Sequence, residues 1–324
     1  MTFILRRFAF YLVAILITIS FNFLIPRLMP GDPVDALFAG AQGRIPLETL
    51  QAYKEMLGFV DGPLWIQYLK YMKSIFTWDL GPTIMLFPLP VTELLSVKLP
   101  WTLGLAGMST VICVMIGLII GTFAAYNRDG LVDRFMPAFW AFVGAMPQPV
   151  TALFLFFVLA LSWKWFPLSY GANPDLDPGW TVEYVSSVLH HAVLPILCMI
   201  IGGIGAWIFN MRNAMINVLG EDYITMARAK GLSNRRIMAN YAARNALLPV
   251  VTAVSMQIGF VMAGAIFIET VFNYPGVGLL LFKALAARDY PTMQACFLMI
   301  VLFVLVFNFI ADLLNLWLDP RLRK

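Results

Sequence analysis

Long apolar runs separated by polar segments form the main pattern along this chain. A helix needs about 20 mainly apolar residues to cross about 30 Å of hydrocarbon. Six runs reach this length, and they are Phe8–Leu28, Trp101–Tyr126, Phe135–Trp163, His191–Phe209, Leu247–Phe267 and Met293–Leu318. The pattern therefore predicts an all-α, polytopic membrane protein with six transmembrane helices.

Composition supports lipid as the solvent for this chain. Hydrophobic residues make up 60% of the 324 residues and charged residues only 12%, whereas a soluble domain carries about 25% charged residues. The three cysteines, Cys113, Cys198 and Cys296, lie singly within apolar runs, where they read as small hydrophobic residues. The net charge of +4 does not indicate nucleic acid, because no basic patch with interleaved aromatic residues lies in a soluble domain.

Basic residues gather in alternate loops and so predict the orientation. They lie before the first run, between the second and third, between the fourth and fifth, and after the sixth: Arg6, Arg7, Arg128, Arg134, Arg212, Arg228, Lys230, Arg235, Arg236, Arg244, Arg321, Arg323 and Lys324. The positive-inside rule makes this face cytoplasmic. We therefore expect both termini in the cytoplasm and a multi-pass protein of a prokaryotic inner (plasma) membrane.

The opposite face carries one large loop, from about Met29 to Leu99. Within it, Leu64, Trp65, Tyr68, Leu69 and Met72 have nearly helical spacing and predict an amphipathic helix. The stretch 276–287 is apolar but too short to span, which predicts an interfacial or re-entrant helix. We expect two parts: an N-terminal span with this loop at 1–98, and a five-helix core at 99–324.

Motifs for independent chemistry are missing from the sequence. It has no G-x-x-x-x-G-K-[ST] loop, no G-x-S-x-G elbow and no H-E-x-x-H pair. The histidines, His190 and His191, are adjacent and cannot share a helix face as metal ligands. We expect no enzyme activity, metal or cofactor on this chain.

Few polar residues within the runs qualify as pathway residues. One function that the sequence leaves open is that of an ion-coupled secondary transporter, an alternative that normally requires charged residues near the middle of the membrane. Glu269 lies near the outer end of the fifth run, where it either lines a pathway or is a hydrogen-bonded interfacial carboxylate. Met146 and Gln148 flank Pro147 in the third run and are further pathway candidates. Prolines there either open a cavity or shape packing.

The segment from Asn210 to Ala246 is too polar to cross lipid and predicts a helical module. Glu221 and Asp222 suit a helix N-terminus, and Lys230 suits the last turn. Gly231 is placed to end that helix, and Ser233 to cap a second helix that ends before Pro249. The first helix is predicted to show Tyr223, Met226, Ala227 and Lys230 on one side, with small Ala227 and Ala229 allowing close approach. It either lies on the membrane surface or docks into a groove of a cytoplasmic partner.

This module, "EDYITMARAKGL…RNALLP", resembles the EAA loop of ABC-importer permeases, and the chain resembles the dipeptide/oligopeptide permease family in its B-type branch. Further matching segments are Pro30–Pro33, Leu57–Tyr68, Asp79–Gly81, Pro90–Leu103, His191–Pro195, Ile268–Gly278, Arg288–Pro291 and Asp319–Arg323. The resemblance implies the type I ABC importer permease (MetI-like) fold. It also implies transport of short oligopeptides or oligosaccharides, powered by ATPases that dock on a coupling helix at 221–231.

The resemblance implies partners and contact residues as well. The partners would be a second homologous permease subunit, two ATPase subunits or domains, an extracytoplasmic substrate-binding protein and membrane lipid. By analogy the ATPase-coupling residues are Glu221, Asp222, Tyr223, Ala227, Arg228, Ala229, Lys230 and Gly231. Thr225-Met226-Ala227 replaces the Glu-Ala-Ala of the general signature. The stretch "PTIMLFPLPV" after Asp79–Gly81 is closer to oligosaccharide-carrying members, which leaves the cargo open.

Overall fold

The computed structural model describes residues 2–28, 63–128 and 130–318. Within these ranges the regular structure is helical, and a single β-bridge joins Pro82 and Pro90. The all-α prediction is confirmed for this part of the chain. The matching segments at 30–33 and 319–323, and the first half of the one at 57–68, lie outside the described residues.

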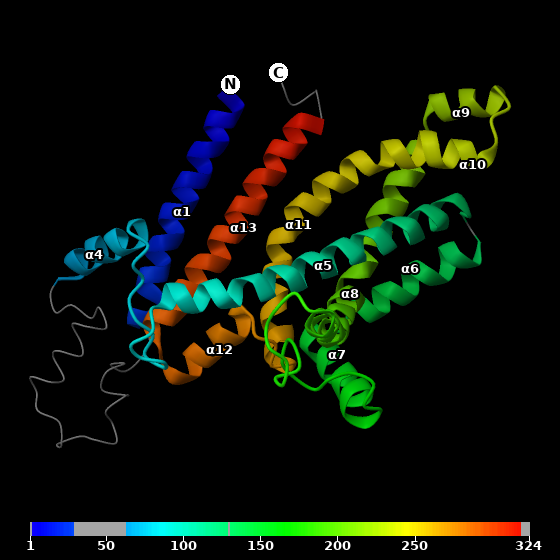
Figure 1. Cartoon of the computed structure of the whole chain (residues 1–324). Helices are drawn as coiled ribbons and strands as arrows, with labels where there is room; N and C mark the ends of the chain where they lie inside the picture. Colours follow the sequence, from blue (N-terminus) through cyan, green and yellow to red (C-terminus); the bar gives the residue numbers. More distant parts are fainter. Residues whose placement is uncertain (1, 29–62, 129, 319–324) are drawn as a thin grey trace, which may run out of the picture. The chain divides into compact units, whose positions relative to one another are not determined.

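The helices follow the apolar runs, and Figure 1 shows them in chain order. They are α1 (Thr2–Leu28), α4 (Leu64–Phe76), α5 (Val91–Tyr126), α6 (Leu131–Gly144), α7 (Gln148–Leu155), η2 (Phe156–Ser162), α8 (Val182–Leu219), α9 (Asp222–Ala229), α10 (Asn234–Arg236), η3 (Ile237–Ala243), α11 (Arg244–Val271), α12 (Val277–Ala287) and α13 (Tyr290–Leu318). The amphipathic helix expected in the first large loop is α4, and the short apolar helix expected near residue 280 is α12.

Four described helices, α1, α5, α8 and α13, are long and apolar enough to cross a membrane. They coincide with the first, second, fourth and sixth predicted spans, although α5 and α8 are longer than expected at 36 and 38 residues. The 28-residue α11 covers the fifth predicted span. A total of six spans and the side on which the termini lie stay predictions.

The third predicted span, Phe135–Trp163, is not one straight helix. It is divided into α6 and the continuous pair α7–η2, which meet at an angle of 95°. Pro147 takes an extended backbone conformation before α7. A proline also disfavours the helical region for the residue before it, here Met146. The chain therefore turns at Met146–Pro147, so the prolines bend this span sharply.

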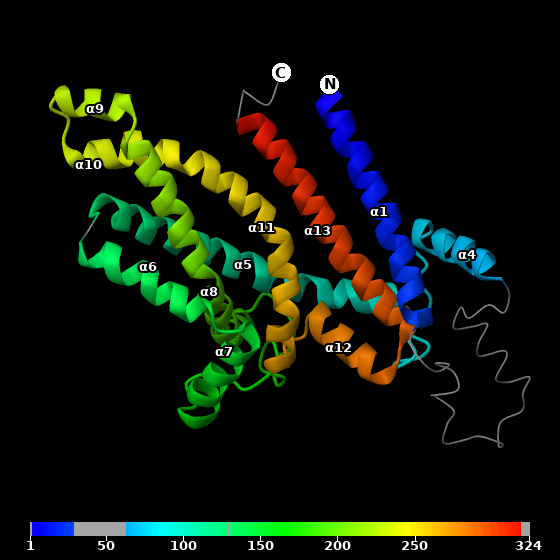
Figure 2. The ribbon, with the colours of Figure 1, turned by 180° about the vertical axis from the view of Figure 1, so that it is seen from behind.

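By its own contacts the chain forms two compact units, residues 1–102 with 275–305, and residues 103–274 with 306–324. The division expected from the sequence, 1–98 and 99–324, stays a prediction. In the second unit α8 is the central helix and packs against α6, α7 and α11. Figure 2 shows this arrangement from behind. Asp133 of α6 also forms a bidentate ion pair with Arg212 of α8. Arg212 Nε contacts Asp133 Oδ1, and Arg212 Nη2 lies 3.1 Å from Asp133 Oδ2.

The glycines of "GLIIG" bring α5 against α8, as the small-xxx-small pattern predicts. A Cβ atom added at Gly117 would stand 2.4 Å from the Cβ of Trp207. One added at Gly121 would stand 2.6 Å from the carbonyl oxygen of Ile208. Both distances are too short for any side chain, so the two backbones touch directly at these positions.

Replacing Gly117 with alanine is therefore expected to separate α5 from α8 and lower the melting temperature. A Cβ atom added at Gly107, on the same helix, would meet no atom within 4 Å. Gly107→Ala is the matched control, and it should be neutral or stabilising by about 0.5–1 kcal/mol because alanine favours the helix. Thermal unfolding of both purified variants measures the difference. Equal melting temperatures would contradict the close approach.

In the first unit, α4 lies against the second half of α1 through buried polar contacts. Tyr68 Oη lies 2.8 Å from Ser20 Oγ, and Asn22 donates to Tyr71 Oη at 3.0 Å. Asn22 also donates to the carbonyl oxygen of Gln294 in α13 at 2.7 Å. Burial raises the pKa of Tyr71 well above its usual value, so the phenol keeps its proton. Asn22 thus ties α1, α4 and α13 together.

Asp289 organises the turn between α12 and α13. Its carboxylate is fully buried, and Oδ1 accepts a hydrogen bond from the backbone N–H of Thr292, which caps α13. Oδ2 accepts from Thr83 Oγ1 and from the backbone N–H groups of Ile84 and Met85, at 2.8 and 3.1 Å for the latter two. One side chain therefore holds both the helix start and the segment that follows Asp79–Gly81.

Candidate coupling site

The polar module lies between α8 and α11. Figures 1 and 2 both show α9 and α10 together at one end of these two long helices, with α7 at the other end. Glu221 occupies the N-cap position of α9 with extended backbone angles, and Asp222 lies in its first turn. The positive end of the helix dipole is stabilised by negative side chains at these positions. The sequence-predicted start of this helix is confirmed.

Gly231 ends α9 in a left-handed conformation, with φ of +73°. The N–H of Leu232 donates to the carbonyl of Ala227 at 3.3 Å, and the N–H of Gly231 donates to the carbonyl of Arg228 at 2.9 Å. These two bonds define a Schellman motif, which requires a residue at positive φ and so favours glycine. The predicted glycine stop is confirmed, and it reverses the chain toward α10.

The two faces of α9 differ from the expected arrangement at Ala227. Ile224 and Ala227 are buried, at 0% and 3% exposure. Ala227 therefore contacts its own chain, and its part in ATPase coupling stays a prediction. The small methyl group instead allows α9 to lie close to its own chain. Ile224, which the sequence analysis passed over, is three residues before Ala227 and belongs to the same inner face.

The outer face of α9 is the one opposite Ile224 and Ala227. At 100° per residue, Asp222, Thr225, Met226 and Ala229 lie on this side. Met226 is 62% exposed, which is unusual for an apolar side chain on an otherwise polar helix. Tyr223 and Lys230 flank this face on one side and Arg228 on the other, and all three are exposed. One exposed apolar side chain, Met226, therefore faces away from the chain beside acidic and basic side chains.

Tyr223 links α9 to the helix that follows it. Its hydroxyl accepts a hydrogen bond from Asn245 Nδ2 at 3.1 Å, and the same amide also donates to the carbonyl of Tyr241 at 2.8 Å. Asn245 was not singled out from the sequence, because a lone polar residue at the start of a helix carries no distinctive pattern. Asn245 therefore links α9 to the start of α11.

The second helix of the module differs from the prediction. Ser233 occupies the N-cap position of α10, but its side chain makes no capping hydrogen bond. The helix then passes without interruption through the π-helical η3 into α11, which contains Pro249. The prediction that it ends before Pro249 is wrong. The helix tolerates the missing N–H of proline there, so α10, η3 and α11 form one continuous helix.

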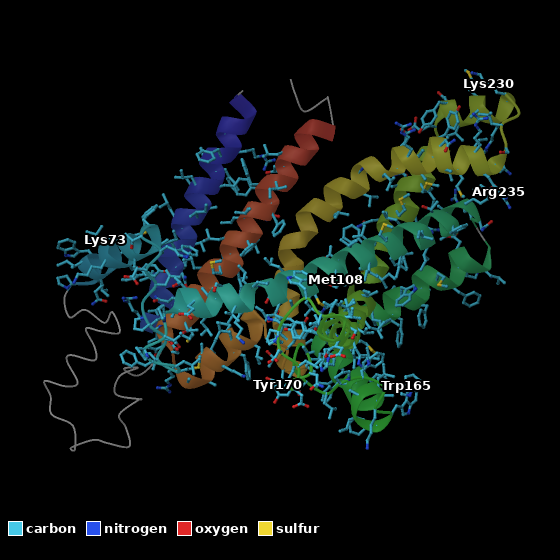
Figure 3. All side chains as sticks on the ribbon, in the orientation of Figure 1. Lys73, Met108, Trp165, Tyr170, Lys230 and Arg235 are labelled. Carbon is cyan, nitrogen blue, oxygen red and sulfur yellow. The ribbon has the colours of Figure 1, made fainter. Side chains whose placement is uncertain are left out.

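The charged end of the module and the aromatic loop after η2 lie at opposite ends of the second unit. Figure 3 labels Lys230 and Arg235 at one end and Trp165 and Tyr170 at the other. Trp163 and Trp165 form a tilted ring pair with centroids 4.6 Å apart, and both are more than half exposed. This separation agrees with basic residues facing the cytoplasm and aromatic residues lying at the outer interface.

The predicted pathway residues lie on different elements. Met146 is exposed at the turn between α6 and α7. The side chain of Gln148 lies against α8, where a Cβ at Gly202 would stand 3.6 Å from its Cγ. Glu269 is fully buried in the last turn of α11. A pathway role for these three residues stays a prediction.

Comparison with known families identifies this architecture. Residues 117–324 match the family described as binding-protein-dependent transport system inner membrane component, and residues 1–83 match the N-terminal family of the same membrane components. The chain belongs to this family. It is therefore the non-catalytic permease subunit of an ABC importer in a bacterial inner membrane, and ATP hydrolysis takes place on other chains.

Full-length relatives agree with this assignment. The chain is 32% identical to the dipeptide transport system permease protein DppB of Escherichia coli K12, over 99% of this chain and 98% of the relative. It is 32% identical to the oligopeptide transport system permease protein AppB of Bacillus subtilis 168, with the same coverage. A putative peptide permease of Brucella suis is 33% identical over 93% of this chain and 92% of the relative.

A solved structure shows the same fold. The chain superposes on a chain of the inward-facing MetNI methionine ABC transporter with a TM-score of 0.57, covering 70% of this chain and 97% of that one. At 15% identity this likeness concerns the fold alone. The predicted MetI-like permease fold is confirmed.

Proposed function

We propose that this permease subunit moves short peptides inward and that α9 is the helix on which an ATPase subunit docks. The observation that carries the docking proposal is the shape of α9. It has a buried inner face at Ile224 and Ala227, an exposed Met226 on the outer face, and a fixed glycine stop at Gly231. An amphipathic helix laid into a groove is a recurrent form of protein recognition.

The proposed contact residues are revised by this geometry. Asp222, Met226 and Ala229 form the surface that meets the ATPase, with Tyr223, Arg228 and Lys230 at its edges. Glu221 and Gly231 set the two ends of the helix, and Ala227 sets its distance from its own chain. The proposed transporter also contains a second homologous permease, two ATPase subunits and an extracytoplasmic binding protein. The ATPase subunits bind the ATP and Mg²⁺.

Met226→Asp is expected to weaken ATPase binding because the flexible apolar side chain would no longer fill the groove. Burying one such side chain contributes about 1.5–3 kcal/mol, so affinity should fall by roughly tenfold or more. Titration of the detergent-solubilised permease complex with its ATPase subunits measures the change. Met226→Leu, the matched control, should bind like the native protein. Unchanged binding by Met226→Asp would contradict the docking face.

Peptide cargo is proposed because relatives that match nearly the whole chain are named as dipeptide and oligopeptide permeases. The exposed Trp163–Trp165 pair is the observation that favours oligosaccharides as the second candidate, because aromatic rings can stack on sugar faces. A thermal-shift screen of the cognate binding protein decides between them, since a bound ligand raises apparent stability. Stabilisation by peptides alone supports the proposal, and stabilisation by oligosaccharides alone overturns it.

Reconstitution tests the transport mechanism itself. Proteoliposomes that contain the complete transporter should accumulate cargo only when ATP and the ATPase subunits are present. Transport that persists without the ATPase subunits would indicate the ion-coupled carrier and would contradict the proposed function.

A further inference from the structure

The outer end of α1 lies at the level of lipid headgroups. The apolar part of α1, Arg6–Ile25, has 20 residues, which at 1.5 Å per residue spans about 30 Å, the thickness of the hydrocarbon core. Arg27 stands two residues beyond that part. In the same unit, the apolar part of α13 begins at Tyr290, so Gln294 lies within about one turn of its outer end. The apolar parts of α1 and α13 thus place Arg27 and Gln294 at the same depth, near the outer surface of the membrane.

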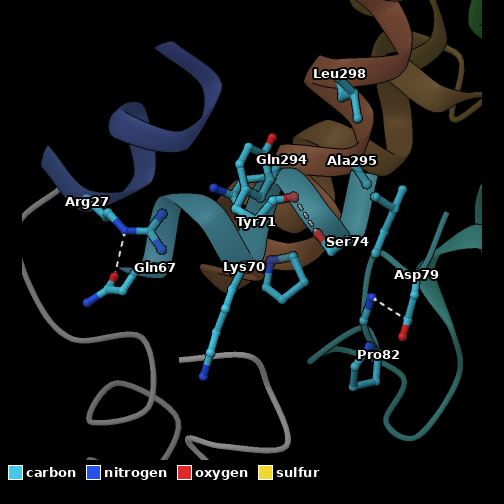
Figure 4. Close-up of a pocket in the computed structure, with 13 residues that line it drawn as sticks. Arg27, Gln67, Lys70, Tyr71, Ser74, Asp79, Pro82, Gln294, Ala295 and Leu298 are labelled. Carbon is cyan, nitrogen blue, oxygen red and sulfur yellow. Dashed lines mark hydrogen bonds between the residues drawn. The ribbon is translucent and has the colours of Figure 1, made fainter. Parts of the chain in front are cut away.

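A pocket of about 340 Å³, lined by both polar and apolar side chains, opens at this depth within the first unit. Arg27, Gln67 and Lys70 line it from α1 and α4, Asp79 from the following loop, and Gln294 from α13. Figure 4 shows Arg27 and Gln67 at one end of this group and Asp79 and Pro82 at the other. Its volume lies in the range of small-molecule sites, about 300–1,000 Å³. Arg27 and Asp79 therefore stand at separate ends of one pocket, with Lys70 between them.

Neighbouring groups fix the orientation of the Arg27 guanidinium. Its Nε donates to Gln67 Oε1 at 3.1 Å, and Nη1 donates to the carbonyl of Phe23 at 2.8 Å. Its carbon lies 3.6 Å from the centre of the Phe23 ring. These contacts use two of the five N–H groups, and the other three have no acceptor among the described residues. A positioned guanidinium with spare donors suits a phosphate group.

The opposite end of the pocket suits a cation. Asp79 is exposed, and its Oδ1 accepts one long hydrogen bond, at 3.4 Å, from the backbone N–H of Gly81. Its second oxygen has no donor among the described residues. Lys70 also lines the pocket. Together, Arg27, Lys70 and Asp79 give the pocket a net charge of +1. The pocket is therefore complementary to a group that carries a phosphate and, beyond it, an ammonium.

Exposed apolar side chains lie on the same two helices as the pocket lining, although Trp65 and Leu69 lie on the side of α4 opposite Gln67 and Lys70. Leu24, Ile25 and Leu28 are exposed on the last turns of α1. On α4, Leu64, Trp65 and Leu69 are exposed as well. A tryptophan on an amphipathic helix beside the end of a span is typical of the membrane interface. Acyl chains can therefore lie along α1 while a headgroup occupies the pocket, which a soluble ligand would not require.

We propose that this pocket binds a phospholipid headgroup of the phosphoethanolamine type in the outer leaflet of the membrane. Arg27 and Lys70 hold the phosphate, and Asp79 accepts a hydrogen bond from the ammonium. The orientation follows from the positive-inside rule, which places Arg6 and Arg7 in the cytoplasm and the other end of α1 outside. The lipid would fasten α4 to α1 at the membrane surface.

Native mass spectrometry of the complete transporter, purified from membranes of mixed phospholipids, tests the site. We expect the native complex to retain phosphatidylethanolamine. Arg27→Gln and Lys70→Gln should each lower retention about fivefold, since one basic residue near a membrane surface contributes about that factor. Asp79→Asn should remove the preference for phosphatidylethanolamine over phosphatidylcholine, whose quaternary ammonium cannot donate a hydrogen bond.

Lys73→Gln is the matched control, because Lys73 lies on α4 one turn from Lys70, is exposed and is not part of the pocket lining. It should retain lipid like the native complex. Equal retention by every variant would overturn the proposal.

A second measurement adds soluble phosphoethanolamine or a zwitterionic dipeptide to the delipidated complex. Stabilisation by either that equals the effect of the intact lipid would also overturn it, because the site would then serve a soluble ligand.

Discussion

Gly231→Val is expected to uncouple ATP hydrolysis from transport, with at least a roughly tenfold fall in cargo moved per ATP. The residue sits at φ of +73°, where an L-residue costs about 1–2 kcal/mol and a β-branched residue costs more. A Cβ there would meet no atom within 4 Å, so the strain comes from the backbone alone. The Schellman turn would open, and α9 would lose its fixed direction relative to α10.

The measurement compares ATPase rate and cargo uptake in proteoliposomes that contain the complete transporter. Gly220 is the matched control, because it ends α8 just before the same module but has an ordinary φ of −83°. Gly220→Val should leave the coupling ratio near the native value, and both variants should insert normally. A Gly231→Val transporter with unchanged uptake per ATP would contradict the role of this turn.

Asp289→Ala is expected to produce the largest loss of stability in the first unit. The substitution removes the acceptor for Thr83 Oγ1 and for the backbone N–H groups of Ile84, Met85 and Thr292. Each buried donor left without an acceptor costs about 1–3 kcal/mol, and loss of the helix cap costs about 1 kcal/mol. We expect a total loss of several kcal/mol, on the order of 3 or more.

Thermal unfolding of the purified complex, followed by tryptophan fluorescence, measures this effect. Glu93→Ala is the control, because Glu93 is an exposed carboxylate in the first turn of α5, in the same unit, and is not part of the pocket lining. It should unfold close to the native temperature. If Asp289→Ala unfolded at the same temperature as Glu93→Ala, the anchoring role of Asp289 would be wrong.

Much of the coupling module followed from local sequence rules. The acidic start at Glu221 and Asp222 and the stop at Gly231 depend on the helix dipole and on glycine conformation, which act within a single turn. The spacing of apolar residues in α4 and the length of the apolar runs are equally local. These features could be predicted because each depends on a few neighbouring residues.

Other features depend on contacts between distant segments and were missed. Asp289 and Thr83 are 206 positions apart, and Asn245 meets Tyr223 across 22 positions. No periodicity in a single sequence marks such pairs. The bend at Met146–Pro147 was also unpredictable, since a proline in a long apolar run is compatible with a kink, a break or an uninterrupted helix, as Pro249 in α11 shows.

The sequence by itself determined that this chain is a helical membrane protein with a polar helical module between two apolar runs, because hydropathy and helix capping depend on adjacent residues. Only the tertiary structure decided which side of that module faces outward. Ile224 and Ala227 turn inward against the chain's own core and leave Met226 exposed. Burial is the sum of contacts with every packed neighbour, and that sum exists only once the chain has folded.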